Sequence, residues 1–245
     1  MKMEALKFTL AGKSAFFKKP DVNTKVYFTY NNIHKVALLG LLGAVTGLSG
    51  YYKDQATDKK EKPEFYSSLC NLKVSVVPNA YRGYFTKKIQ YFNNSTGYAS
   101  DEEGGNLQVF EQWLESPCWT IYIYNGGIGQ DLWDKLCDYI LHGKCVYIPY
   151  LGKNDHPAVI TDAEMIALEP VQADHVDSLF PGSLDLIDDT QAYNGRPYIF
   201  TEYAPYALED QFNFYLLERF IYTNCLLQQS VQDTFRYNDL ILAFY

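Results

Sequence analysis

Three residues near the start of the chain have side chains that could act on RNA. Tyr30, His34 and Lys35 lie just before an apolar run. A tyrosine, a histidine and a lysine can together cleave RNA by general acid–base catalysis without a metal. The same cations at the start of a helix can instead hold a phosphate, because the first helical turn leaves N–H groups free. We favour phosphate binding over catalysis, with Asn31 as a further contact.

A second candidate site interleaves aromatic and basic residues between Tyr81 and Tyr98. Single-stranded nucleic acid is held by cations along its backbone and by aromatic rings that stack on its bases. Residues 93–97 read Asn-Asn-Ser-Thr-Gly, which is a turn signal and predicts a projecting hairpin. The alternative is a hairpin that faces protein or solvent. The candidate contacts in this hairpin are Arg82, Tyr84, Lys87 and Lys88.

Two loops add further donors. The first runs from residue 12 to 20, directly after a predicted strand, and carries Lys13, Lys18 and Lys19. The second begins at Tyr150 and could present a cation and backbone N–H groups to phosphate. Its candidate contacts are Gly152, Lys153 and Asn154, although an ordinary polar turn would look the same.

Charge is divided unevenly along the 245 residues. The net charge is −8, but residues 1–100 carry 15 basic against 6 acidic side chains, and residues 101–245 carry 6 against 23. A basic half attracts a polyanion. The acidic half would repel RNA and is better suited to protein partners.

Several classes of protein are disfavoured by the remaining composition. The five cysteines are odd in number and widely spaced, which fits free thiols in a reducing cytoplasm. The start of the chain lacks the apolar core of a signal peptide, and the longest apolar run, 36–50, is too short to span a bilayer. The acids at 185, 188 and 189 favour a surface loop over a metal site. We therefore expect a cytoplasmic protein with no membrane contact, metal or cofactor.

The apolar run at 36–50 predicts a helix with two unlike faces. At about 100° per residue, four glycines, at 40, 43, 47 and 50, fall on one side and the leucines on the other. Interior glycine weakens a helix by roughly 0.5–1 kcal/mol relative to alanine. A sheet, a neighbouring chain or a phosphate backbone must therefore approach the glycine face closely, and we favour the chain's own sheet.

The order of the predicted elements indicates the fold class. Strand, helix, hairpin, strand, helix and strand follow one another at 5–10, 36–50, 81–98, 120–124, 131–141 and 146–150, with a polar loop at 51–68. This predicts an α+β chain with a ferredoxin-like (RRM-like) domain over 1–157. A β-hairpin thumb is inserted at about 80–110, and a smaller β-rich segment follows over 158–245.

Three segments resemble the fifth CRISPR-associated (Cas) family, with a leaning towards its type I-B branch. They are KFTLAGKSAFFKKP at 7–20, YFTYNNIHKVALLGLLGAVTGLSGYY at 27–52 and YIPYLGKNDHPA at 147–158. Two positions depart from the family pattern. Asn31 and Asn32 stand where many members have prolines, and Lys18 and Lys19 where many have arginine. Both changes keep hydrogen-bond donors in place.

The resemblance implies an RNA-binding subunit of a type I CRISPR interference complex (Cascade), which caps the 5′ handle of the guide RNA in antiviral defence. It implies contacts with the backbone subunit of Cas family seven and the large subunit of Cas family eight, and with target DNA only through the complex. We expect no catalysis. The alternatives are a metal-independent endoribonuclease, as in type I-C, and an unrelated protein-interaction module. The sequence has no histidine between His34 and His142, so the thumb cannot supply one.

Overall fold

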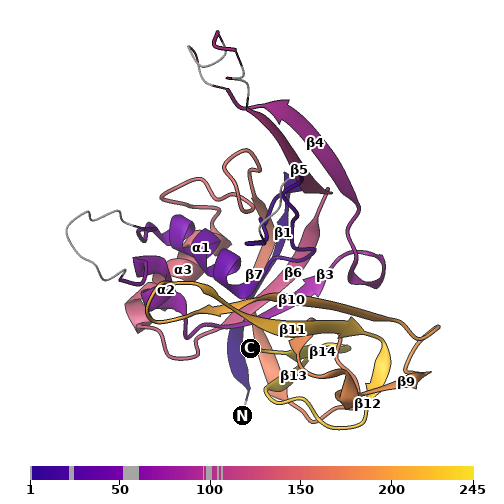
Figure 1. Cartoon of the computed structure of the whole chain (residues 1–245). Coiled ribbons are helices and arrows are strands. Elements are labelled where there is room, and N and C mark those ends of the chain that lie inside the picture. The colour runs from indigo at the N-terminus through magenta and orange to yellow at the C-terminus, as the bar shows by residue number, and fades with distance from the viewer. Residues whose placement is uncertain are drawn as a thin grey trace.

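The structure is a computed structural model that describes residues 2–21, 25–51, 61–95, 97, 101–103, 105 and 107–245. It is an α+β fold in which strands predominate (Figure 1). Four antiparallel strands form the central sheet in the order β7-β1-β6-β3, and β13 and β14 extend it beyond β7. Their bounds are β1 Met3–Ala11, β3 Lys73–Pro78, β6 Cys118–Tyr124, β7 Val159–Pro170, β13 Thr234–Tyr237 and β14 Leu240–Ala243.

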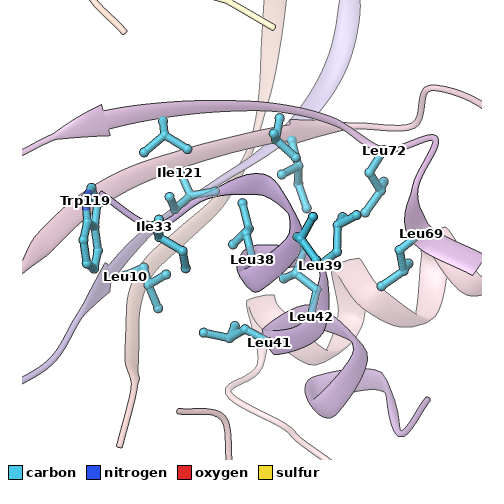
Figure 2. Close-up of a cluster of buried hydrophobic side chains, with 14 of the residues drawn as sticks. Leu10, Ile33, Leu38, Leu39, Leu41, Leu42, Leu69, Leu72, Trp119 and Ile121 are labelled. Atoms are coloured by element: carbon cyan, nitrogen blue, oxygen red, sulfur yellow. The ribbon is translucent and has the colours of Figure 1, made fainter. Parts of the chain in front are cut away.

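One face of this sheet carries the main core. The expected alternation in β1 is confirmed, since Leu6, Phe8 and Leu10 are fully buried towards the helices. The helices are α1 (Lys35–Thr46), α2 (Glu64–Leu69) and α3 (Gln130–Leu141). The leucines of α1 pack into the same cluster (Figure 2). Each large apolar side chain buried in this way stabilises the fold by about 1.5–3 kcal/mol.

The glycine face of α1 packs on α2, not on the sheet as expected. A Cβ at Gly43 would lie 2.5 Å from the Phe65 Cβ, so only glycine allows this approach. The prediction of a loop at 51–68 is therefore wrong from residue 64 onwards, where α2 begins. The helix also ends earlier than expected, because Gly47 takes a left-handed conformation, φ 86°, and its N–H bonds the Gly43 carbonyl. That arrangement is a common helix end.

The predicted strand at 146–150 is also wrong. Its apolar residues are exposed, and its backbone caps a helix, because the N–H groups of Val146 and Tyr147 donate to the carbonyls of Val45 and Ala44. The last carbonyls of a helix lack partners within it, so they compete with strand pairing for such donors. The strand that pairs with β1 in its place is β7.

A long hairpin projects from the body (Figure 1). It consists of β4 (Lys87–Asn93) and β5 (Gln108–Glu115), with β2 (Ser14–Ala15) on the other side of β5. The short 3-10 helix η1 (Tyr81–Gly83) forms its root. Residue 96 of the predicted turn at 93–97 lies outside the described residues, as do residues 98–100, 104 and 106 of the predicted thumb.

The remaining strands form the C-terminal part. A long ribbon of β10 (Ile199–Leu208) and β11 (Tyr215–Thr223) crosses the molecule below the central sheet (Figure 1). The shorter elements are β8 (Phe180–Pro181), η3 (Leu184–Leu186), β9 (Ile187–Ala192) and β12 (Cys225–Leu227). Strands from both sides of residue 157 share the central sheet, and the division into two parts stays a prediction. Within the described part of the chain, no helix has the length and apolarity needed to cross a membrane.

Candidate nucleic-acid interface

The hairpin root carries two cations beside aromatic rings, the exposed Arg82 and the half-buried Lys87. The Arg82 guanidinium carbon lies 5.0 Å from the Tyr81 ring centroid and 5.6 Å from that of Tyr198. The Lys87 ammonium lies 4.4 Å from the Tyr84 ring. Burial lowers the pKa of Lys87, while Glu202 opposes this shift and Lys19 adds to it. These pairs form a surface in which a cation and a flat ring are presented together.

The loop before α1 brings a further cation to this side. Lys18 is exposed, and its ammonium lies 3.7 Å from the Tyr27 ring centroid. Tyr27 bridges to β5 at Glu111, which ties the loop to the hairpin. Among the described residues, Lys18, Arg82 and Lys87 have no carboxylate partner within ion-pair distance. Lys13 is likewise exposed and without such a partner in the part of the chain that the structure describes.

Three other predicted cations are already paired. Lys19 lies 3.2 Å from a Glu202 oxygen, and Lys88 lies 3.6 Å from a Glu115 oxygen. Lys153 is 3.2 Å from an oxygen of Glu111 and 3.2 Å from one of Asp155. Burial opposes the charge of Lys153, but its hydrogen bonds to these two carboxylates outweigh that effect and raise its pKa. A phosphate would have to compete with these partners.

Glu111 anchors the loop at 150–156 to the hairpin. Its carboxylate is buried, accepts a hydrogen bond from the Trp113 indole at 2.8 Å and pairs with Lys153. Gly152 has φ 86°, and a Cβ there would lie 2.1 Å from the Phe16 carbonyl oxygen. Gly152 therefore allows two loops to pack closely against each other. Asn154, two residues further along the chain, is exposed.

Four predicted contacts are buried: Tyr30, Asn31, His34 and Lys35. The His34 Nδ1 caps α1 by accepting from the Ala37 N–H at 3.2 Å, and burial lowers the pKa of His34 to about 3. The Lys35 ammonium donates to the Tyr245 main-chain oxygen at 3.1 Å, and burial lowers the pKa of Lys35 to about 8. Burial also raises the pKa of Tyr30. Direct RNA contact by these groups stays a prediction that would require movement.

A groove of about 780 Å³ runs along the small-residue side of α1. Its lining is mostly apolar and aromatic. Among the described residues that line the groove, Lys18 is the one cation whose side chain is exposed. The lining includes Phe16, Ala37, Gly40, Ala44, Tyr147, Tyr150 and Tyr215. The described residues contain no cluster of metal-binding side chains.

Sequence reasoning missed two residues of this interface, Tyr198 and Glu202. Both come from the C-terminal part and reach the hairpin root through the fold. No local pattern marks them, because each is an ordinary residue of a β-rich stretch. Tyr27 and Tyr81, in contrast, stood within the aromatic runs that the sequence shows.

Similarity to known proteins is found at the level of the whole fold. No protein-family model matches the chain, and no curated protein matches it. A solved chain described as "CRISPR RNA-guided surveillance complex" matches with a TM-score of 0.50 and 11% identity over 91% of this chain and 90% of that one. A CRISPR protein from Archaeoglobus fulgidus matches with a TM-score of 0.50 and 10% identity over 98% of both chains. The chain is thus similar in fold to CRISPR proteins.

Proposed function

We propose that this chain is an RNA-binding subunit of a type I CRISPR interference complex, and that it caps the 5′ handle of the guide RNA. The observation that carries the proposal is the likeness to a chain of an RNA-guided surveillance complex over nearly the whole length. The resemblance of the sequence to the fifth Cas family supplies the finer part of the proposal, the capping of the 5′ handle in a type I complex.

The arrangement of the central sheet supports an RRM-like core. Helix α1 lies between β1 and β3 in the chain, and α3 lies between β6 and β7. The spatial order β7-β1-β6-β3 supports the ferredoxin-like core that we propose. The β4–β5 hairpin is an insertion between β3 and β6, which supports its assignment as the thumb.

The hairpin root, together with Lys18 beside Tyr27, is the surface that we assign to RNA. Lys18, Arg82 and Lys87 would contact phosphates, and Tyr81 and Tyr84 would stack on bases. Phosphate contacts set the position of a strand, whereas base contacts set sequence preference. The surface is thus suited to hold a short single strand by charge and stacking.

The C-terminal ribbon supports contacts with other subunits. Large apolar side chains at its end are exposed, among them Phe212, Phe214, Leu216 and Leu217. Exposed apolar patches of this kind mark protein interfaces, and the acidic half of the chain is unsuited to RNA. We assign this surface to the protein partners that the family implies, the family seven and family eight subunits.

We further propose that the chain is not a nuclease. General acid–base catalysis needs a group that exchanges a proton near neutral pH. His34 is buried, caps a helix and has its pKa lowered to about 3 by burial, so it stays neutral. Purified protein and precursor RNA, mixed without divalent metal, test this. Specific cleavage by the wild type that is lost in His34→Gln would establish the nuclease alternative instead.

Co-expression with the neighbouring genes, followed by sequencing of the bound RNA, tests the proposed function. We expect one short RNA with a constant 5′ end. The variant Arg82→Ala, Lys87→Ala, Lys88→Ala should then lower the log–log salt slope by about 0.7 for each lost phosphate contact. The matched control replaces Lys135, Lys144 and Arg236, which are exposed cations of the acidic half. An equal loss in the control, or no bound RNA, would contradict the proposal.

A further inference from the structure

Asn31 is the main side chain that holds the root of the β4–β5 hairpin, and the Asn32 amide adds a longer hydrogen bond, 3.4 Å, to the Gly83 carbonyl. The Asn31 side-chain amide donates to the Gly83 carbonyl at 2.7 Å, and its oxygen accepts the Phe85 N–H at 3.2 Å. Both bonds are buried, where an unsatisfied polar group costs about 1–3 kcal/mol. A single side chain thus grips the backbone on both sides of Tyr84.

The backbone that Asn31 grips has an unfavourable conformation. Arg82 has φ 54° and Gly83 has φ 72°, so both lie in the left-handed region. A non-glycine residue is held there at a cost of about 1–2 kcal/mol. The turn also has no room to shift towards β11, because a Cβ at Gly83 would lie 2.5 Å from Tyr222. The direction of the Arg82 side chain therefore depends on what holds the turn.

Glu202 of β10 holds Asn31 in turn. One Glu202 carboxylate oxygen accepts the Asn31 main-chain N–H at 2.8 Å, and the other lies 3.2 Å from the Lys19 ammonium. Glu202 therefore has two opposite influences on a cationic surface. It fixes the loop that carries Asn31, and it neutralises a lysine that could otherwise meet phosphate.

We propose that Asn31 and Glu202 are positioning residues that set the direction of Arg82 towards RNA, with Glu202 also reducing the charge that Lys19 offers. This inference rests on the proposed function. It reassigns Asn31 from an RNA contact to a support of the hairpin root. It also gives the C-terminal ribbon a part in RNA binding, although the ribbon's own charge would repel RNA.

A double-mutant cycle on the full chain tests the role of Asn31, with a single-stranded 5′ handle RNA as probe. We expect Asn31→Ala to weaken binding about tenfold in the wild-type background and less than about twofold in an Arg82→Ala background, since coupled residues are not additive. Asn125→Ala is the control, because its side chain orders the turn before α3, outside the interface. It should leave the affinity unchanged.

The outcomes separate the inference from the proposed function. If the wild type does not bind the RNA, the proposed function fails. If it binds and the losses of Asn31→Ala and Arg82→Ala simply add, or Arg82→Ala has no effect, the positioning role is wrong. If Asn31→Ala only destabilised the protein in general, its loss of RNA affinity would add to the loss caused by Arg82→Ala. The salt slope of binding would then not change.

Two substitutions at Glu202 give an independent test that survives poor folding of Asn31→Ala. Glu202→Gln keeps an oxygen for the Asn31 N–H and releases Lys19, so binding should tighten and the salt slope should steepen by about 0.7. Glu202→Ala removes the acceptor as well, and binding should weaken relative to Glu202→Gln. Equal affinity of the two variants would overturn the positioning role of Glu202.

Discussion

The start of α1 and the root of the β4–β5 hairpin look alike in sequence and differ in the fold. Each combines cations with tyrosines next to a turn. At the start of α1, His34 and Lys35 are buried and bond the chain's own backbone. At the hairpin root, Arg82 and Tyr84 face solvent beside other rings. Cations beside a helix start are thus no sign of a ligand until their burial is known.

The electrostatic consequence separates the two regions further. Burial lowers the pKa values of His34 and Lys35, because a charge is poorly solvated inside the protein. These two groups thus contribute to the stability of the fold through their hydrogen bonds to the backbone. At the hairpin root, burial also lowers the pKa of Lys87, but Arg82 is exposed, and its charge can act on a polyanion. The following substitutions test this contrast, in order of decreasing expected effect.

Charge reversal should have different results in the two regions. Lys35→Glu places a carboxylate against the Tyr245 main-chain oxygen, and we expect the free energy of unfolding to fall by about 3–5 kcal/mol. Arg82→Glu should change it by less than about 0.5 kcal/mol but should weaken RNA binding. Urea denaturation and RNA titration of both variants measure the contrast. Similar stability of the two variants would show that the site of Lys35 is open to solvent.

Acid should destabilise the protein through His34. The folded pKa is about 3 against an ordinary 6.5, so the unfolded state takes up the proton first as pH falls. Stability contributed by neutral His34 is present above pH 6.5 and is lost below it, by about 2 kcal/mol between pH 7.5 and pH 5. His34→Asn keeps a capping oxygen and should lack this loss. His142→Asn, at an exposed histidine, should retain it; equal pH profiles for all three proteins would contradict the assignment.

Lys153 should behave as a structural cation. Lys153→Met keeps the apolar stem but leaves the buried Glu111 carboxylate without its ion pair, and we expect a loss of about 1–3 kcal/mol in unfolding free energy. The salt slope of RNA binding should not change. Thermal denaturation and salt titration give both values, and Lys153→Arg is the matched control. A lower slope with unchanged stability would place Lys153 on the RNA instead.

The smallest effect on stability is expected at Lys18. Because Lys18 is exposed, Lys18→Ala should change the unfolding free energy by less than about 0.5 kcal/mol. It should still lower the salt slope of RNA binding by about 0.7 if one phosphate contact is lost. Binding isotherms at several salt concentrations measure the slope. An unchanged slope would remove Lys18 from the interface.

Much of the fold can be predicted from local patterns. The alternation in β1, the spacing of apolar residues in α3 and the two faces of α1 each indicate the correct element. Failures occurred where the partner of a segment was remote. The apolar run at 146–150 has strand composition, yet its N–H groups cap α1. The helix at 64–69 was missed because it is only six residues long and is stabilised mainly by packing on α1.

The sequence by itself determined the division of charge, the need for something close to the glycine face of α1, and the concentration of cations and rings at 81–88. Only the tertiary structure decided which of those cations are available. Lys35 is buried, and Lys19 and Lys153 have carboxylate partners brought from residues far away in the chain. The physical reason is that a charge acts on a ligand only if it is solvated and unpaired, and both conditions depend on long-range contacts.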